Sequence, residues 1–227
     1  MIEGGLPFWK MEGAGNDLPL VDARAERRPE TRDWPALARR MCDRRFGVGG
    51  DGLMALEPSS RGAALARMFN PDGTEDFCGN GLRCVAAYLC HRGEGADVVI
   101  ETPRGLHRAR TTAAGAREYE VDVEIMEPRF DAAGVPALAQ GEMVERVLDL
   151  RDVKRVATSV GMGTTHTVIF SGEEVSEAEF LRDSPRIETL ALFPDRTSVL
   201  WARVVSPERV EMRIWERGVG ETLALRR

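Results

Sequence analysis

Cys78 lies within the stretch FNPDGTEDFCGNGLRC, residues 69–84, directly before a glycine–asparagine–glycine turn and an apolar run. A helix that begins after this cysteine would leave the N–H groups of Gly79, Asn80 and Gly81 at its positive end, where they can bind an anion. The same electric field lowers the pKa of a thiol and raises its thiolate fraction near neutral pH. A carboxylate bound there would bring its own α-carbon beside Cys78. The stretch therefore predicts a thiolate that removes an α-proton.

Two other interpretations of Cys78 start from the same residues. A cysteine at the start of a helix commonly packs in the core, but the pattern N-x-D-G-T-x-x-x-C-G-N-G places turn residues and polar acceptors where a plain core would be apolar. A cysteine–histidine hydrolase would use Cys78 as the nucleophile and His166 as the base. Such an enzyme forms a covalent acyl intermediate that can be trapped, whereas proton transfer by a thiolate leaves none.

Two further patterns resemble cofactor sites but have the wrong context. GVGGDG, residues 47–52, matches G-x-G-x-x-G. However, a predicted helix precedes it and a strand follows, which reverses the order that dinucleotide binding requires. Cys78, Cys84 and the pair Cys90–His91 could suggest a metal, but a spacing of six turns successive cysteines to different faces of a helix. We therefore expect neither a nucleotide site nor a metal site.

The composition indicates a soluble, globular protein with a small-molecule partner. The 227 residues carry a net charge of −6, which argues against nucleic acid or an anionic membrane as the main partner. No amino-terminal signal or membrane-length apolar run is visible, and four cysteines without a CxxC pair are typical of a reducing cytoplasm. Lys10 and Lys154 are the only lysines, and neither lies in a glycine-rich phosphate-binding setting. We therefore expect a cytoplasmic protein without pyridoxal phosphate or another cofactor.

The elements around Cys78 follow from periodicity and capping residues. A strand is expected over residues 15–23, and a helix is expected from Trp34, capped by Asp33 and stopped by Gly47. The helix after Cys78 repeats apolar residues at helical spacing and stops at the next glycine. Further strands are expected at LMALE, ALARMFN, DVVIET, LHRARTT and EYEVDVEIM.

The second half of the chain follows a stretch with the proline, glycine and alanine content of a linker, residues 127–141. Residues 153–172 and 197–218 are rich in strand formers, the latter with a Pro–Glu hairpin turn. Helices are expected around residues 142–147 and 177–192.

The two halves share short patterns at a nearly constant offset. GAGNDLPLV from Gly13 and GMGTTHTVI from Gly161 both place a glycine turn before a strand, 148 residues apart. RMFN ending at Asn70 and RIWE ending at Glu216 share a basic–apolar–aromatic–polar order, 146 residues apart. The near-constant offset predicts two related domains.

Stretches in order along nearly the whole chain closely resemble the diaminopimelate epimerase family: KMEGAGND, RRFGVGGDGL, FNPDGTEDFCGNGLRC, EPRF, GMGTTHTV, FPDRTS and RIWERGVGETLA. The resemblance implies an α+β fold of two pseudo-symmetric domains, residues 1–126 and 127–227, each a strongly curved β-sheet wrapped around a central helix. It implies an isomerase that converts LL- to meso-diaminopimelate, a precursor of lysine and peptidoglycan, without a cofactor. It further implies a homodimer, with the substrate held between the domains and between two cysteines, one from each domain.

The resemblance assigns roles to residues at matching positions. Cys78 matches one of the two acid/base thiols, and His166 and Glu216 match polar residues that assist the cysteines. Arg217 matches the residue that binds the distal carboxylate, for which guanidinium is a suitable partner. The resemblance also assigns substrate binding to Asn16, Asn70, Gly79, Asn80, Thr164 and Ser198. It gives Glu216 a role in substrate binding in addition to its role beside the cysteines.

Two sites near the expected distal end of the substrate depart from the family pattern. Thr164 and Thr165 stand where the family has asparagine–proline, and Ser198 stands where it has asparagine. A hydroxyl group has a shorter reach and fewer donors than an amide, so the substrate is less firmly implied than the family. A related isomerase of another amino acid is the alternative.

Leu225 is the largest departure. Carried forward by the mean offset of the repeats, Cys78 corresponds to Leu225, where the family has its second cysteine, followed by a second central helix. We expect the second domain to lack that helix and to be less stable than the first, because one face of its sheet would stay uncovered. One thiol can exchange an α-proton with solvent, but inversion should be very slow. A catalytically silent family member is a further alternative.

Overall fold

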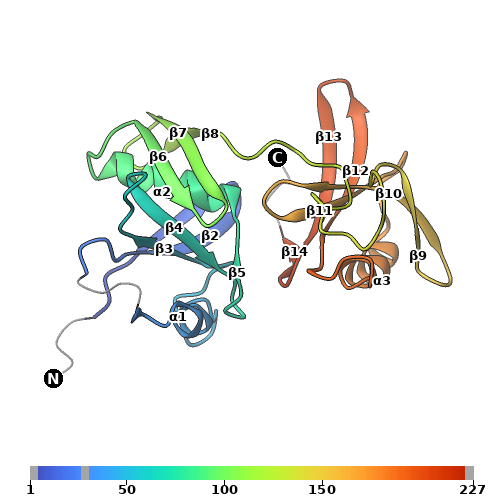
Figure 1. The fold of residues 1–227 in the computed structure, drawn as a ribbon, viewed down its shortest axis with the longest axis horizontal. Helices are drawn as coiled ribbons and strands as arrows, with labels where there is room; N and C mark the ends of the chain where they lie inside the picture. The colour runs from blue at the N-terminus through green and yellow to red at the C-terminus, as the bar shows by residue number, and fades with distance from the viewer. Residues whose placement is uncertain (1–4, 27–30, 223–227) are drawn as a thin grey trace. The chain divides into compact units, whose positions relative to one another are not determined.

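The computed structural model describes residues 5–26 and 31–222, and the chain divides into two compact units, Met1–Ile125 and Met126–Arg227 (Figure 1). Within the described residues, the first unit contains an eight-stranded sheet and two helices, and the second contains a six-stranded sheet and one helix. The expected α+β architecture with two sheets is confirmed.

The sheet of the first unit has the strand order β1-β2-β3-β4-β6-β7-β8, and β5 pairs with β4. The pairs β2–β3 and β4–β6 are parallel, and the remaining pairs are antiparallel. The strands are β1 (Trp9–Gly13), β2 (Asn16–Asp22), β3 (Leu53–Glu57), β4 (Ala64–Phe69), β5 (Glu75–Asp76), β6 (Asp97–Thr102), β7 (Gly105–Ala113) and β8 (Tyr119–Val123).

Helix α2 (Gly79–His91) is the central element of the first unit. It contacts β1 and β8, which are the two edge strands, and also β2, β4, β6 and β7. Because strands from both edges and from the middle contact one helix, the sheet must curve around it. The buried side chains of α2 come from the apolar residues that predicted this helix, among them Leu82, Val85, Ala86 and Leu89.

Helix α1 (Trp34–Met41) joins β2 to β3 and packs on the other side of these strands with the core residues Val21, Leu53 and Phe69. The carboxylate of Asp33 accepts a hydrogen bond from the Ala36 N–H at 2.9 Å, so the predicted cap is present. The helix ends at Met41, six residues before the expected stop at Gly47.

The sheet of the second unit has the order β14-β13-β12-β11-β10-β9. Among the described strands of this unit, only β11 and β12 pair in parallel. Helix α3 (Glu177–Glu188) joins these two strands, and it buries Phe180 and Ile187 against the sheet. The strands are β9 (Arg146–Asp149), β10 (Lys154–Gly161), β11 (Thr165–Phe170), β12 (Ser198–Ser206), β13 (Arg209–Glu216) and β14 (Gly220–Thr222).

The helix expected around residues 142–147 is wrong. Strand β9 begins at Arg146 and pairs with β10, so that Val147 lies opposite Val156. Leu148 is buried at 2% exposure while Val147 is 60% exposed, which is the alternation of a strand. A neighbouring strand overrides the local helical preference here, because pairing satisfies the backbone hydrogen bonds that a short helix would leave open.

The two units repeat the same order of elements. The run β1-β2-α1-β3-β4-β5 corresponds to β10-β11-α3-β12-β13-β14, with the same parallel and antiparallel pairs. Phe69 pairs with Glu75, and Trp215 pairs with Glu221, so this register repeats at an offset of 146. Within residues 126–222, α3 takes the place of α1, and α2 has no counterpart. Leu225 lies outside the described residues.

Candidate active site

Cys78 is the N-cap residue of α2, as the sequence predicts. Its Sγ accepts a hydrogen bond from the Gly81 N–H at 3.2 Å, and its carbonyl oxygen accepts one from the Leu82 N–H at 3.0 Å. The first N–H groups of α2 have no partner within the helix and lie beside the thiol. A Cβ added at Gly79 would meet no atom within 4 Å apart from its chain neighbours and the helix's own backbone, so there is space for a ligand next to these groups. A carboxylate can therefore approach the amino-terminal end of α2.

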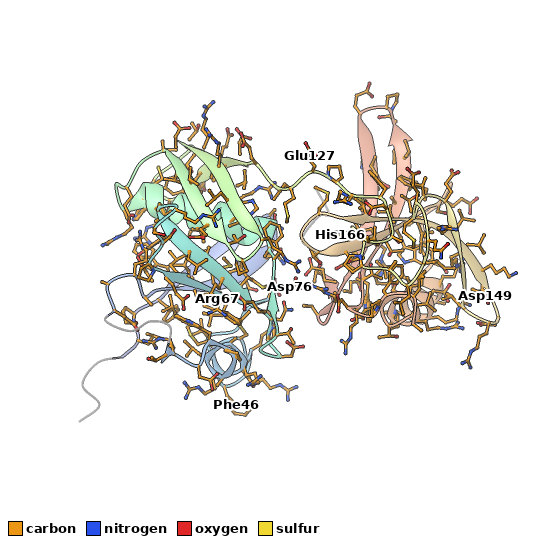
Figure 2. The ribbon with its side chains drawn as sticks, viewed as in Figure 1. Phe46, Arg67, Asp76, Glu127, Asp149 and His166 are labelled. Atoms are coloured by element: carbon orange, nitrogen blue, oxygen red, sulfur yellow. The ribbon has the colours of Figure 1, made fainter. Side chains whose placement is uncertain are left out.

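Cys78 also lines a cavity of about 330 Å³ within the first unit. Asp76 and Arg104 line the same cavity, and Asp76 lies at the end of β5 (Figure 2). Apolar side chains from β3, β4 and α2 complete its wall, among them Met54, Met68 and Leu82. The thiol is thus partly exposed to a cavity with charged groups, and it is not sealed in the core.

The four cysteines differ in their surroundings, and none forms a disulfide. Cys42 and Cys84 are buried, and desolvation raises the pKa of the Cys42 thiol to about 11 and that of the Cys84 thiol to about 12. Cys78 and Cys90 are half-buried. Of these two, Cys78 alone lies at the amino-terminal end of a helix, which favours it as the reactive thiol.

Asn16, at the start of β2, is linked directly to the end of α2. The side-chain amide of Asn80 donates to Asn16 Oδ1 at 2.9 Å, and Asn16 Nδ2 donates to Asp51 Oδ2 at 3.2 Å. Arg83, one turn along the helix, donates to Asn80 Oδ1. Asn16 is 5% exposed. The structure therefore places Asn16 beside Asn80, at the same end of α2 as Cys78.

Asp51 belongs to a charged cluster that supports Asn16. It accepts a hydrogen bond from the Asp17 N–H at 3.1 Å and forms an ion pair with Arg44 at 2.8 Å. Arg44 and Lys10 also pair with Asp17, at 2.7 and 2.9 Å. Burial alone would raise the pKa of Asp17, but the hydrogen bonds from Arg44 and Lys10 outweigh it and lower the pKa well below its usual range. The Asp17 carboxylate is therefore ionised at neutral pH.

Asn70 follows β4 and has a different set of contacts. Its side-chain amide donates to Thr74 Oγ1 at 3.0 Å, and its backbone N–H donates to the Thr74 carbonyl oxygen at 2.8 Å. The Gly73 N–H donates back to Asn70. Asn70 thus closes the tight turn before β5, and none of these contacts joins it to Asn16 or Asn80.

In the second unit, Glu216 is the last residue of β13, and Arg217 is the first residue of the turn to β14. Glu216 pairs with Gly220 across the turn. The Arg217 N–H donates to Ser198 Oγ at 3.1 Å, and the Arg217 guanidinium donates to the Asp195 carbonyl oxygen at 2.9 Å. The segment before β12 thus orients the arginine that the resemblance assigns to the distal carboxylate.

His166 lies on β11 (Figure 2), next to Ser198 in the parallel pair. Ser198 also accepts the Arg217 N–H, so Ser198 lies beside two other predicted site residues of this unit. Thr164 lies in the turn before β11, where its carbonyl oxygen accepts from the Met162 N–H at 3.0 Å. The hydroxyl of Thr165 is buried and donates to the Val135 carbonyl oxygen at 3.0 Å. Of the two threonines, only Thr164 is partly exposed.

Two residues of the site region were missed by sequence reasoning. Asp51 falls inside the GVGGDG pattern, which resembles a nucleotide motif and is part of a family stretch, but the sequence predicts no role for this residue. Glu188 ends α3 and accepts hydrogen bonds from Trp215 Nε1 at 2.7 Å and from the Gly218 N–H at 2.9 Å. A carboxylate at the carboxyl end of a helix is unfavourable locally, and this was the available signal.

The described residues contain no group of three or more histidine, cysteine, aspartate or glutamate side chains that could hold a metal ion. Among the same residues, no helix has the length and apolar character needed to span a bilayer.

The sequence matches the family model described as "Diaminopimelate epimerase" over residues 8–129. A relative from Desulforudis audaxviator, named diaminopimelate epimerase, is 43% identical over 223 residues, which is 96% of this chain and 79% of the relative. A second relative of the same name, from Moorella thermoacetica, is 40% identical over 221 residues, covering 96% of this chain and 78% of the relative.

Solved structures with the same fold are more distant in sequence. A probable proline racemase from Agrobacterium radiobacter K84 has a TM-score of 0.66 at 12% identity and covers 95% of this chain and 72% of its own. A hydroxyproline epimerase from Agrobacterium vitis has the same TM-score and identity, and covers 95% and 71%. At this identity the likeness concerns the fold alone.

Proposed function

The chain belongs to the diaminopimelate epimerase family, and on that premise we propose that it is an amino-acid epimerase that acts on the α-carbon of diaminopimelate through Cys78. The observation that carries this proposal is the position of Cys78 as the N-cap of α2, beside open space at Gly79. A carboxylate bound by the first N–H groups of α2 would present its α-carbon to the thiol. Asn16 and Asn80 lie close enough to contribute side-chain amides to the same carboxylate.

The proton transfer can be written in full. The Cys78 thiolate removes the proton from the α-carbon and becomes a thiol, and the electron pair of the broken C–H bond delocalises into the carboxylate. The N–H groups of Gly79 and Asn80 stabilise the charge that develops there. Return of a proton to the same face restores the substrate, and return to the opposite face inverts the centre. Neither direction requires an oxidant, a metal or a cofactor.

The second unit supplies groups for the distal end of the substrate in this proposal. Arg217, oriented by Asp195, binds the distal carboxylate, and Thr164 and Ser198 donate hydroxyl hydrogen bonds. His166 and Glu216 assist proton transfer. We further propose, from the resemblance, that Asn70 contributes to substrate binding, that the protein is a homodimer and that it works in the cytoplasm. Light scattering coupled to size-exclusion chromatography tests the dimer.

Leu225 bears on the rate of inversion. The resemblance places it where the family has its second cysteine, and a leucine side chain has no exchangeable proton. We therefore propose that α-proton exchange on the Cys78 face is faster than inversion in this chain. A Leu225→Cys variant should raise the rate of inversion relative to that of exchange.

The experiment is deuterium incorporation into diaminopimelate in D₂O, followed by NMR and by chiral separation of the stereoisomers. We expect deuterium at the α-carbon that depends on Cys78. Exchange that persists in a Cys78→Ala variant would contradict the assignment of the thiol. A trapped acyl-enzyme at Cys78 would favour a hydrolase instead.

A second candidate is an isomerase of another amino acid. The observation in its favour is Ser198, whose short side chain already accepts a hydrogen bond from the Arg217 N–H at 3.1 Å. A site with hydroxyl groups in place of amides would discriminate less strongly in favour of the distal amino-acid group. Comparing deuterium exchange of diaminopimelate with that of amino acids lacking a second amino and carboxyl group separates the two candidates.

A further inference from the structure

Glu188 is a buried carboxylate in a place that helix energetics disfavour. It is the last residue of α3 and is 7% exposed. The carboxyl end of a helix carries partial negative charge, so an acidic side chain there loses stability locally. Burial of a charge costs more unless it is hydrogen-bonded. The contacts that compensate these costs identify what Glu188 holds.

These contacts lie on both sides of Glu216 and Arg217, where β13 ends and the turn to β14 begins. Glu188 Oε2 accepts from the indole N–H of Trp215 at 2.7 Å, and Oε1 accepts from the backbone N–H of Gly218 at 2.9 Å. One carboxylate therefore binds the residue before Glu216 and the residue after Arg217. The guanidinium of Arg196 lies 3.6 Å from the same Oε1 and completes its neutralisation.

The remaining anchors of this turn come from the same segment of chain. Ser198 accepts from the Arg217 N–H, and the Asp195 carbonyl oxygen accepts from the Arg217 guanidinium. The Glu188 carbonyl oxygen also accepts from the Thr197 N–H at 3.2 Å, which ties this segment back to α3. Helix α3, the segment up to β12 and the turn after β13 thus meet at Glu188.

We propose that Glu188 is a positioning residue for the reaction: without touching the substrate, its carboxylate holds Glu216 and Arg217 in the orientation that binds it, and this inference rests on the proposed function. The turn requires both carboxylate oxygens of Glu188 as hydrogen-bond acceptors. In Glu188→Gln, one carboxylate oxygen becomes an NH₂ group that faces a donor, so one of the two hydrogen bonds is lost at nearly constant volume.

The experiment compares Glu188→Gln with Glu179→Gln in the full chain. Glu179 lies on the same helix but pairs with Arg155 and Ser176, so it is a matched control for charge removal from α3. Three quantities are measured: amide hydrogen exchange at Gly218, the dissociation constant for meso-diaminopimelate, and the KM and kcat of Cys78-dependent deuterium exchange. A thermal melt reports whether each variant folds.

We expect Glu188→Gln to fold, to exchange the Gly218 amide at least about 10-fold faster and to bind diaminopimelate about 10-fold more weakly, in line with loss of one hydrogen bond to a charged group. KM should rise more than kcat falls, because Arg217 contributes to binding. Glu179→Gln should match the wild type in all three. A purely structural role would lower the melting temperature without changing KM.

Each other outcome is decisive. If the wild type binds diaminopimelate and Glu188→Gln binds it equally well, the positioning role is wrong and the proposed function stands. If the wild type neither binds diaminopimelate nor exchanges its proton, the proposed function fails, and the role of Glu188 fails with it. Should Glu188→Gln not fold, Trp215→Phe removes one of the two donors and leaves the carboxylate, and unchanged affinity in that variant overturns the inference.

Discussion

Asn80, in the first turn of α2, donates its side-chain amide to Asn16 at the start of β2, 64 positions earlier in the chain. Asp51 fixes the orientation of the Asn16 side-chain amide. Because its carboxylate accepts the hydrogen bond from Asn16 Nδ2, Asn16 Oδ1 faces Asn80. Arg44 holds Asp51 in turn. A line of side chains thus runs from a surface arginine to the amino-terminal end of α2, where the substrate carboxylate is proposed to bind.

This line predicts different effects for two changes at Asp51. In Asp51→Asn, the amide oxygen can still accept from Asn16 and from the Asp17 N–H, because both donate to the same oxygen. Only the contact with Arg44 is lost, and we expect less than about a 5-fold loss of deuterium exchange. Asp51→Ala leaves Asn16 without its acceptor and should lower exchange by about 10- to 100-fold, equivalent to ~1.4–2.8 kcal/mol. Equal rates for the two variants would contradict the orienting role of Asp51.

Replacement of Cys78 by serine should separate catalysis from stability. A serine hydroxyl is a good N-cap acceptor and can keep the hydrogen bond from the Gly81 N–H, so the melting temperature should stay the same or rise. The hydroxyl is too weak an acid to act as the base, so deuterium exchange should fall by about 10³-fold or more. Cys78→Ala removes the cap as well and should lose ~0.5–2 kcal/mol of stability. Substantial exchange by the serine variant would show that another group removes the proton.

The parts of this site that were predictable from sequence are local in the chain. Cys78 and the apolar positions of α2 lie within one turn or a few turns of each other, and Asp33 caps α1 three residues away. The duplication is also visible in the sequence, since Asn70 directly follows β4 and Glu216 is the last residue of β13. Helical spacing, capping and repetition each leave a pattern in neighbouring residues.

The unpredicted parts depend on partners far along the chain. Asp51 acts through Asn16, 35 positions away, and Glu188 acts through Gly218, 30 positions away. Nothing in either local stretch shows which donor will arrive there. The helix expected around residues 142–147 failed for the same reason, since β10 provides the pairing that makes β9 a strand. The sequence also could not show which of Thr164 and Thr165 is buried, because the hydroxyl of Thr165 is buried by its contact with the distant Val135.

The contacts of Asp22 should make the free energy of unfolding of the first unit depend on pH. It accepts hydrogen bonds from Arg24 at 2.6 Å and from the Tyr88 hydroxyl at 2.9 Å, and so ties β2 to α2. Burial would raise the pKa of Asp22, but these hydrogen bonds outweigh it and lower the pKa below the unfolded value. The folded state then binds fewer protons, so this stabilisation is complete above pH ~4 and is lost as the pH falls through the folded pKa.

Asp22→Asn should therefore lower the free energy of unfolding at pH 7 by about 1–3 kcal/mol and reduce its decline below pH ~4. Urea unfolding at several pH values measures both effects. Asp97→Asn is the control, because it removes a solvent-exposed pair with Arg110 and should leave the free energy of unfolding nearly unchanged. A parallel decline of the wild type and Asp22→Asn below pH 4 would rule out this linkage.

Thiol labelling should distinguish Cys78 from the buried cysteines. The raised pKa values of Cys42 and Cys84, about 11 and 12, leave roughly one thiolate in 10³–10⁴ at pH 8, and both side chains are buried. We expect iodoacetamide to modify Cys78 first and diaminopimelate to slow that modification. Peptide mass spectrometry gives the order of labelling. Cys90 is half-buried as well and serves as the internal reference, because substrate should not protect it.

Substitution of Asp183 should destabilise the second unit and leave the first unit unchanged. It is fully buried on α3 and accepts from Arg155 on β10 at 2.6 Å and from Arg182 at 2.7 Å, while Arg155 also stacks on Trp201. Asp183→Ala leaves the partly buried guanidinium of Arg155 without its main partner, and we expect a loss of about 3–5 kcal/mol in chemical denaturation. Glu179→Gln removes the more exposed partner of the same arginine and should cost below ~1 kcal/mol. Hydrogen exchange locates the effect: protection should fall in β10 and α3 and remain in α2, because Asp183 makes these contacts within the second unit alone. A similar loss of protection in α2 would mean that the two units unfold together.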